Sequence, residues 1–414
     1  MTALYPWIMW FFATSFFAYQ FIMRVFLGLC VPEIMQKFQV NATDFGLMAS
    51  LYYYGYAGMQ IPIAFLLDRF GPRSIISLSC FTCTLSIFLF YWTDNWYLAL
   101  LARFLIGAAS AAGFLGASKV ISLWFPYRLY ARMVGLSFSL GLLGAVYGGR
   151  PVSHLITLYG WENVLLIIGT VGLILTGLLC LTIKPYKVSF LHEGPVFLKN
   201  LKSLFSMPAL LLMAGANLLM VGPLEGFADV WGVPYLMQAY TLQKEDAAFV
   251  TSAIFTGMLL GGPLLAYFAE KFNASYQITA LCGLLMAALF SIMLLAQGHL
   301  NDTLLYVMMF IVGILCCYQV LVFAIGTAYV SEGMRGVTVA FLNCINMLGG
   351  SFFHTTIGVL MDHFWTGATA NGQRLYEAHA YDYALWTIPL AAGIGGFVFM
   401  LLSPSRYKTN KSAG

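Results

Sequence analysis

Long apolar stretches alternate with short polar segments along almost the whole chain. A helix needs about 20 consecutive apolar residues to cross the hydrocarbon core of a bilayer. Stretches of roughly that length lie near positions 7–31, 44–66, 74–92, 97–120, 131–154, 163–183, 207–231, 247–268, 276–297, 303–328, 337–361 and 382–402. The pattern therefore predicts an all-α membrane protein with about twelve transmembrane helices. The first stretch has neither a basic flank nor a small-residue cleavage site, so we expect a retained helix rather than a signal peptide.

Two segments of the first half of the chain recur in the second half. The octet VPEIMQKF at 31–38 returns as VPYLMQAY at 233–240, and LLDRFG at 66–71 returns in degraded form within YFAEKFN at 267–273. Such a repeat indicates two pseudo-symmetric six-helix bundles and is typical of transporters whose substrate site lies between the repeats. We expect bundles at 1–183 and 207–402, a cytoplasmic linker at 184–206 and a cytoplasmic tail at 403–414.

Composition and charge support a lipid environment. Hydrophobic residues make up 61% of the chain and charged residues only 9%, and the mean hydropathy is +0.83. These values lie outside the range of soluble domains. The formal net charge of +4 is no reason to expect nucleic-acid binding in such a chain.

Basic residues gather in the loops of one side of the predicted helices. The inner loops hold Arg69, Arg73 and the lysines of the linker, whereas the outer loops hold only Lys37, Lys244 and Arg374. Because Lys and Arg are enriched in short cytoplasmic loops, both termini are predicted to lie in the cytoplasm. We expect a multi-pass, monomeric protein of a bacterial inner membrane.

Motifs of enzymes and of metal sites are not found in the sequence. It has no phosphate-cradling Gly-Lys-Ser/Thr, no His pair at metal-ligand spacing and no nucleophile elbow. The eight cysteines lie in apolar stretches without metal-ligand spacing, which favours packing roles. We therefore expect no catalytic residues, no metal and no cofactor.

Several local motifs resemble those of the major facilitator superfamily. The run Ala64-Phe-Leu-Leu-Asp-Arg-Phe-Gly-Pro-Arg73 is similar to the family signature between its second and third helices, although the family usually has Gly at position 64 and a basic residue at 72. Arg103-Phe-Leu-Ile-Gly107 resembles the fourth-helix motif, and Trp124-Phe-Pro126 resembles the exit from that helix. The resemblance covers the whole chain and implies transport by alternating access of two bundles.

The resemblance also implies a gate at the inner ends of the helices. An Asp at a helix end can pair with Arg or with a neighbouring helix N-terminus and so hold one of two bundle arrangements. The resemblance assigns gating or coupling roles to Asp68, Arg69, Arg73 and Arg103. The alternative is that the first three only mark a turn and follow the positive-inside rule. The equivalent segment of the second half, 270–273, matches the signature less well. We therefore expect the strength of the gate to differ between the two halves.

Three charged residues lie well inside predicted membrane helices, where a charge costs about 2.5–3.5 kcal/mol and usually faces a cavity. They are Arg24 in the first helix and Glu225 and Asp229 in the seventh. The repeat offset aligns Arg24 with Gly226, so the cation and the carboxylates should face one cavity from opposite bundles. The alternative is a direct interhelical salt bridge without ligand contact, or a bridge that substrate breaks.

Arg24 is the strongest single candidate for a substrate-binding residue. Family members that carry phosphate esters or organic anions have a similarly spaced first-helix Arg, but the phosphate-ester carriers add a second Arg in the seventh helix. Because carboxylates replace that second cation here, we expect a ligand with an anionic and a cationic group, foremost an amino acid. The segments 19–24, 52–60 and 225–234 also resemble the phagosomal nutrient transporters of intracellular bacteria, which import amino acids or nucleosides.

Other substrates and activities remain open from the sequence. The strongest alternative is an organic-anion, sugar-acid or other monocarboxylate importer that uses Arg24, with proton entry through Asp229. A nucleoside importer, a drug exporter and a non-transporting nutrient sensor are further alternatives.

Proton symport requires a carboxylate that exchanges its proton during the cycle. Glu225 and Asp229, one helical turn apart, are the candidates, with no basis for choosing between them. Neutral polar residues should complete the site: Tyr19, Tyr53, Gln60, Asn343 and Asn346, beside Gln20, Tyr56 and Gln319. His354 is more typical of a packing residue.

Overall fold

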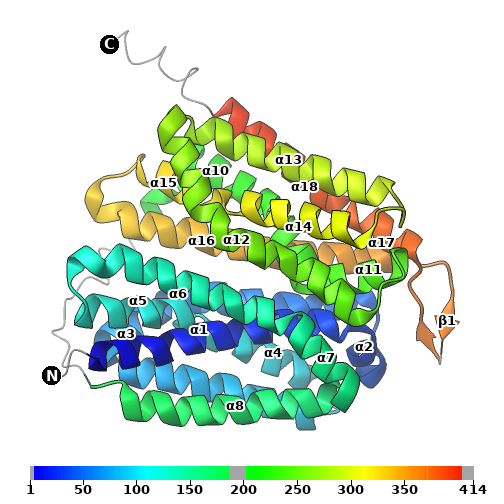
Figure 1. The fold of residues 1–414 in the computed structure, drawn as a ribbon, viewed down its shortest axis with the longest axis horizontal. Coiled ribbons are helices and arrows are strands. Elements are labelled where there is room, and N and C mark those ends of the chain that lie inside the picture. The colour runs from blue at the N-terminus through cyan, green and yellow to red at the C-terminus, as the bar shows by residue number, and fades with distance from the viewer. Residues whose placement is uncertain (1–3, 186–201, 371, 403–414) are drawn as a thin grey trace.

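The computed structural model describes residues 4–185, 202–370 and 372–402 (Figure 1). The first half comprises α1 Tyr5–Leu29, α2 Val31–Phe38, α3 Ala42–Trp92, α4 Trp96–Ser110, α5 Ala112–Trp124, α6 Tyr127–Gly148, α7 Arg150–Tyr159 and α8 Trp161–Thr182. The second half comprises α10 Pro208–Met220, the π-helix η1 Gly222–Trp231, α11 Gly232–Ala239, α12 Lys244–Phe272, α13 Ser275–Leu295, α14 Asp302–Cys316, α15 Tyr318–Thr327, the 3₁₀-helix η2 Glu332–Met334, α16 Arg335–His363, the strands β1 Thr369–Ala370 and β2 Gln373–Arg374, α17 Ala378–Leu385 and α18 Thr387–Leu401.

The described helices can be matched to the twelve predicted membrane crossings. Within the described residues, 11 helical segments are long and apolar enough to cross a membrane, and one of them is α3 with 51 residues. At 1.5 Å per residue that helix is about 76 Å long, more than twice the hydrocarbon thickness. Gly71 interrupts it with a φ of 78°, directly before Pro72, so α3 makes two crossings. The predicted all-α fold is confirmed, and Tyr5 and Leu401 lie at the same end.

The two halves of the chain form two bundles that face each other. In Figure 1 the helices from α1 to α8 lie below those from α10 to α18. The interface is built by α1 on η1, α3 on α16, and α6 and α7 on α12. Glycines allow close backbone approach there: a Cβ on Gly28 would lie 2.5 Å from the carbonyl oxygen of Asp229. The predicted linker falls largely outside the described residues, so the domain boundaries remain a prediction.

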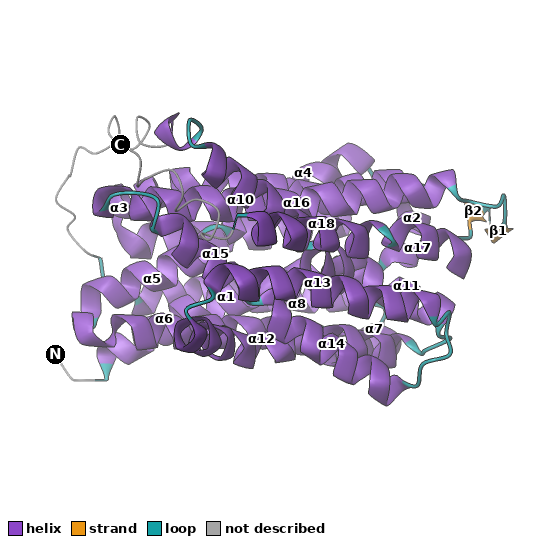
Figure 2. Cartoon of the chain, turned by 90° about the horizontal axis from the view of Figure 1, so that it is seen from above, coloured by secondary structure: helices purple, strands orange, loops and turns teal. Residues whose placement is uncertain are grey.

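The end of the bundles that carries α2 and the β-hairpin is here called the outer end, and the opposite end is the inner end. Figure 2 shows the hairpin projecting beyond the helices at the outer end. It lies between α16 and α17, within the stretch 362–381 that the sequence predicts only as a long outer loop. Its Gln373 donates to the carbonyl oxygen of Met35 over 2.8 Å, so the segment reaches across to the first half.

Asp362, at the end of α16, provides the densest polar link between the halves. Its carboxylate accepts hydrogen bonds from the backbone N–H of Thr43 at 2.8 Å and from the Thr43 hydroxyl at 2.5 Å. Arg374 and Tyr376 donate to its other oxygen. Burial and this hydrogen bond raise the pKa of Tyr376, so its hydroxyl stays protonated. The carboxylate thus lies at the N-terminus of α3, where the helix dipole favours a negative charge.

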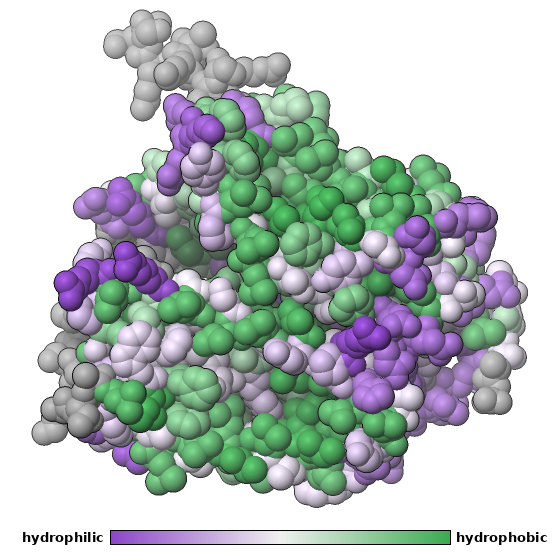
Figure 3. Space-filling model, in the orientation of Figure 1, coloured by the Kyte–Doolittle hydropathy of each residue, from purple (hydrophilic) through white to green (hydrophobic). Residues whose placement is uncertain are grey.

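Further ion pairs close the outer end. Lys244 pairs with Glu33, and Arg150 lies 3.3 Å from Asp246. At the inner end, by contrast, each ion pair found among the described residues lies within one half. Asp68 pairs with Lys119 at 2.6 Å, and Arg335 pairs with Glu332 of η2. Figure 3 shows the surface hollowed between the halves at that end. The described part of the chain is therefore closed outside and faces inward.

We expect Asp362→Asn to weaken the outer closure. A hydrogen bond to a charged group contributes about 1.5–3 kcal/mol, so the outward-open population should rise roughly tenfold. Cys30, buried at the junction of α1 and α2, can report this opening. In a variant that keeps only this cysteine, a membrane-impermeant maleimide added outside should label it about tenfold faster.

The matched control for this measurement is Asp302→Asn. Asp302 is exposed in the first turn of α14, at the same end of the molecule but away from the interface between the halves. Equal labelling rates in Asp362→Asn, Asp302→Asn and the parent protein would show that Asp362 does not hold the outer end closed.

Candidate functional site

The centre of the molecule holds an ion cluster that joins the two halves. Arg24 of α1 lies 2.6 Å through its Nε from Asp229 Oδ2, and its Nη2 pairs with Glu225 Oε2. Both acids come from η1. Arg24 is 7% exposed, Asp229 1% and Glu225 0%. The structure thus brings together the three charges that the repeat offset predicted to face one another, and it joins them directly.

Both acids lie four residues apart on a π-helix, η1. A π-helix closes i→i+5 hydrogen bonds, is rare, and occurs frequently at functional sites. In η1 it contains Pro223 and Gly226 and ends before Gly232. Phe353 of α16 packs against Gly226, where a Cβ would lie 3.0 Å from its side chain. The segment is buried throughout, so the carboxylates are directed towards α1 rather than towards lipid.

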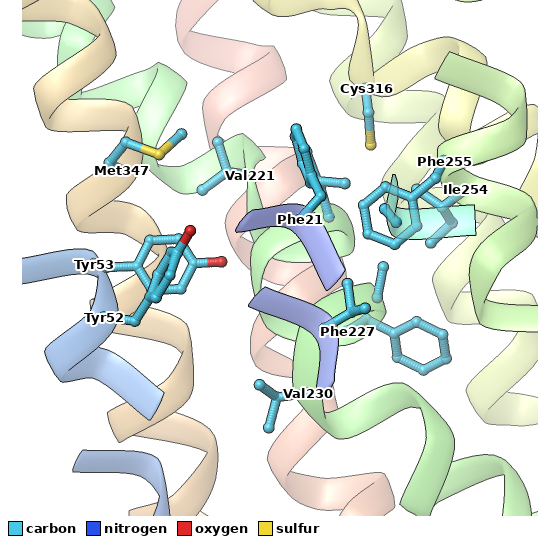
Figure 4. Close-up of a cluster of buried hydrophobic side chains, with 14 of the residues drawn as sticks. Phe21, Tyr52, Tyr53, Val221, Phe227, Val230, Ile254, Phe255, Cys316 and Met347 are labelled. Carbon is cyan, nitrogen blue, oxygen red and sulfur yellow. The ribbon is translucent and has the colours of Figure 1, made fainter. Parts of the chain in front are cut away.

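Two tyrosines of α3 surround the cluster. Tyr53 donates its hydroxyl to Asp229 Oδ2, and its ring lies 5.4 Å from the Arg24 guanidinium carbon. Tyr52 donates to Gln20 Oε1 at 2.5 Å. Figure 4 shows both tyrosine side chains extending from α3 towards the space between the halves. The predicted site residue Tyr53 therefore belongs to the cluster. The contact between Tyr52 and Gln20 was not predicted from the sequence.

Arg103 supports the cluster from α4. Its guanidinium donates to the carbonyl oxygens of Met23 at 2.9 Å and Arg24 at 3.2 Å, and it lies 4.6 Å from the centre of the Tyr52 ring. The sequence predicted a gating or coupling role for Arg103. The structure places it in mid-membrane behind Arg24 and away from Asp68, so it positions the backbone of α1. Together the two arginines balance the two acids.

Each acid of the cluster retains one oxygen without a partner. Glu225 Oε1 and Asp229 Oδ1 are buried and accept no hydrogen bond from the described residues. An unsatisfied buried acceptor is unfavourable, and more so when it carries charge. These two oxygens are therefore the positions in the cluster that can take a proton or a donor group from a ligand.

Two of the predicted site residues lie away from the cluster. Tyr19 donates to the carbonyl oxygen of Ile168 in α8 at 3.0 Å, inside the first bundle. It precedes Arg24 by five residues, and at about 100° per residue the two side chains leave α1 on different sides. Gln60 lies about two turns from Tyr53 towards the inner end of α3 and interacts with Tyr56. Neither contacts Arg24.

The predicted residues of α16 lie on the inner side of the cluster. Asn346 is fully buried and donates to Gln319 of α15 at 3.2 Å. Asn343, one turn closer to the inner end, is partly exposed. His354 lies further out on α16, with its ring 5.3 Å from that of Tyr53.

The predicted inner gate residues do not form a link between the halves in this conformation. Asp68 pairs with Lys119 within the first bundle. Arg69 is exposed and lies over the ring of Phe70, and Arg73 is partly exposed. This arrangement agrees with an open inner end, where a gate would be disengaged. The gating role of these residues remains a prediction.

The repeated octets meet at the outer end. Pro32 and Met35 of α2 and Pro234 and Met237 of α11 line one pocket of about 220 Å³, which the segment 373–376 also borders. The two repeats thus face each other across the interface between the halves. Sequence comparison of the halves identified the octets but gave no sign that they share a pocket.

Sequence reasoning missed one polar residue. Asn217 of α10 is fully buried, and both amide atoms of its side chain lack partners among the described residues. A signal was present, because Asn217 is the single strongly polar residue in the apolar run of α10.

Relatives in other organisms have names that concern transport. The chain is 33% identical over 153 residues to the "Uncharacterized transporter YybO" of Bacillus subtilis and 28% identical over 166 residues to the "Probable galactarate/D-glucarate transporter GarP" of Escherichia coli. Each of these alignments covers 37% of this chain, but only 35% and 36% of the relatives. Over 90% of this chain and 87% of the relative, it is 24% identical to the "Putative tartrate transporter" of Agrobacterium vitis.

Solved structures share the fold over nearly the full length. A bacterial homologue of the human lysosomal transporter Spinster, in an inward-facing and unoccupied conformation, has a TM-score of 0.78 at 19% identity and covers 99% of both chains. A mutant of the nucleoside transporter NupG has a TM-score of 0.77 at 12% identity, over 96% of this chain and 99% of that one.

The family model for the Major Facilitator Superfamily matches residues 8–354 and 230–413, which together cover most of the sequence. This match, over a chain that folds into two facing helical bundles, establishes that the chain belongs to the Major Facilitator Superfamily.

Proposed function

We propose that this membrane transporter imports an organic acid anion together with a proton, and that Arg24 binds the carboxylate of the solute. The observation that carries the proposal is the ion cluster of Arg24 with Glu225 and Asp229 across the two halves. We further propose that the protein works as a monomer in the plasma membrane of a bacterium.

Charge balance supports the coupling of an anion to a proton. Arg24 and Arg103 offset Glu225 and Asp229, so the buried group is neutral when all four are ionised. A proton bound to one acid leaves one positive charge in the cluster, which a monoanion offsets, and protons on both acids leave two, which a dianion such as tartrate offsets. Because an unbalanced charge inside a membrane costs about 2.5–3.5 kcal/mol, the anion and the proton favour each other's binding.

The position of the cluster suggests how binding is linked to movement of the halves. Arg24 belongs to the first half and its two partners to the second, so the ion pairs help to hold the halves together. A solute carboxylate at Arg24 would replace one of these partners, most simply the one that has taken up the proton. The halves could then rearrange without leaving Arg24 unpaired.

The names of the relatives also favour an acid. They concern galactarate and glucarate, tartrate and, for a Cupriavidus necator protein 25% identical over 153 residues, sulfoacetate. All of these solutes are anions at neutral pH. Since several alignments cover little more than a third of the relatives, the solute of this chain is a proposal that needs direct measurement.

The first expected outcome concerns uptake into proteoliposomes. We expect accumulation of labelled galactarate, tartrate or another organic acid when the outside is more acidic, and little accumulation without the proton gradient. An amino-acid panel and nucleosides are tested in parallel, because the two carboxylates facing Arg24 would also suit a ligand with an ammonium group. If the protein accumulates an amino acid but none of the organic acids that lack an amino group, the proposal is refuted in favour of zwitterion transport.

A second prediction concerns Arg24→Lys. Lysine keeps the charge but lacks the planar pair of donors that binds a carboxylate through two hydrogen bonds. We expect the apparent affinity for the acid to fall about tenfold or more while expression is retained. Arg150→Lys, at the exposed outer end, is the matched control. Unchanged affinity in Arg24→Lys would remove Arg24 from the substrate site.

A third prediction separates the two acids. In Glu225→Gln and Asp229→Asn the side-chain shape is kept, but the proton can no longer be exchanged. We expect one of the two variants to lose gradient-driven accumulation and yet to retain exchange of labelled for unlabelled acid across the membrane. The assignment of the proton to this pair of residues is wrong if both variants still accumulate solute.

A further inference from the structure

Three amide side chains come from three neighbouring helices of the second half. They are Asn217 of α10, Gln319 of α15 and Asn346 of α16. The helices are tied together at this level, because Asn346 donates to Gln319 at 3.2 Å and the Tyr318 hydroxyl donates to the carbonyl oxygen of Asn217 at 3.0 Å. We refer to Asn217, Gln319 and Asn346 as the amide layer.

The amide layer has several hydrogen-bonding atoms without partners in the described structure. Both Nδ2 and Oδ1 of Asn217 are unpaired, as are Nε2 of Gln319 and Oδ1 of Asn346. Each of these atoms is buried. Buried amide groups are normally satisfied, and leaving them unsatisfied opposes folding. The unpaired atoms comprise donors and acceptors in similar number, and none of them carries a formal charge.

The amide layer lies next to the cluster on its inner side. Asn346 is one turn before Gly350, where a Cβ would touch the ring of Tyr53, and Tyr53 bonds to Asp229. One turn of helix corresponds to about 5.4 Å along its axis. Val221, the residue before η1, packs against α16, because a Cβ on Gly349 would lie 2.5 Å from its side chain. Asn343 continues the polar path towards the open inner end, where it is partly exposed.

The chemistry of the amide layer limits what it can recognise. A carboxylate or ammonium group would be matched by a charged partner, and the layer has none. A hydroxyl group offers one donor and two acceptors, so adjacent hydroxyls can satisfy paired amide donors and acceptors. Sites built to bond hydroxyl groups discriminate strongly against analogues that lack them, because the amides then stay unpaired.

We propose that the amide layer is a subsite for the hydroxyl groups of the solute, so that the transported acid is polyhydroxylated. This inference rests on the proposed function, since it assumes that Arg24 holds the carboxylate end of the same molecule. It selects sugar acids with one carboxylate over acids without hydroxyl groups, such as sulfoacetate or simple monocarboxylates. A relative from Escherichia coli is named "Probable L-galactonate transporter", whereas the name of the Cupriavidus necator relative concerns sulfoacetate, which has no hydroxyl group.

The experiment compares galactonate with hexanoate, which has a six-carbon chain and one carboxylate but no hydroxyl groups. Dissociation constants are measured by calorimetry on the purified full-length protein. We expect the parent protein to bind galactonate at least about tenfold more tightly than hexanoate, as two or more lost hydrogen bonds would give. In Asn346→Leu and Asn217→Leu, galactonate binding should weaken towards the hexanoate value, whereas hexanoate binding should hardly change.

Thermal unfolding of each variant shows whether the substitution has destabilised the protein, and one exposed variant serves as a control. Asn163→Leu, exposed at the outer start of α8, should leave both dissociation constants unchanged. Equal binding of the two acids by the parent protein, or equal weakening of both acids in a destabilised Asn346→Leu, would overturn the hydroxyl subsite and leave the acid proposal standing. Failure of the parent protein to bind either acid would instead refute the proposed function, and the subsite with it.

Discussion

The pairing of Arg24 with Glu225 and Asp229 is the constraint around which the rest of the membrane domain is arranged. Buried charges must be paired, because an isolated one is strongly disfavoured in a low-dielectric medium. Breaking a buried pair by removing one partner costs about 3–5 kcal/mol. Since the partners belong to different halves, the halves cannot separate at mid-membrane unless something replaces the pairing. Under the proposed function, solute and proton would provide that replacement, and the cluster would then be both the contact that joins the halves and the binding site.

The layers on either side of the cluster have different chemistry. Towards the outer end, Asp362 and the ion pairs near α2 connect the halves through charged contacts that water can reach when they part. Towards the inner end lie tyrosines and uncharged amides, including Asn346. On the proposed route, a solute leaving Arg24 towards the inner end would pass groups that can exchange hydrogen bonds without a charge mismatch. The contacts between the halves thus change from charged groups at the closed outer end to uncharged amides towards the open inner end.

Much of this arrangement could be predicted from the sequence, because membrane helices and repeats leave strong patterns. Arg24, Glu225 and Asp229 were identified because charges are rare inside apolar helices, and the repeat offset placed them opposite one another. The position of Tyr19 could not be judged in the same way, since several faces of α1 contact protein. The π-helix was also not predicted, as the hydrophobic period of a fully buried segment does not reveal i→i+5 bonding. Asn217 was overlooked because no other charged or strongly polar residue accompanies it in α10.

The π-helical segment Gly222–Trp231 also has a consequence for how this protein can change during evolution. A π-helical turn holds more residues than an α-helical turn, so deleting one residue from the segment would favour ordinary α-helical bonding. If the deletion fell between Glu225 and Asp229, the two acids would be three residues apart and would no longer both keep their present positions beside Arg24. The helix beyond Trp231 would largely keep its orientation, because the lost residue is the one that the wide turn accommodates. A change of one residue in the length of this segment would thus alter the ion cluster while leaving in place the outer pocket that α11 shares with α2.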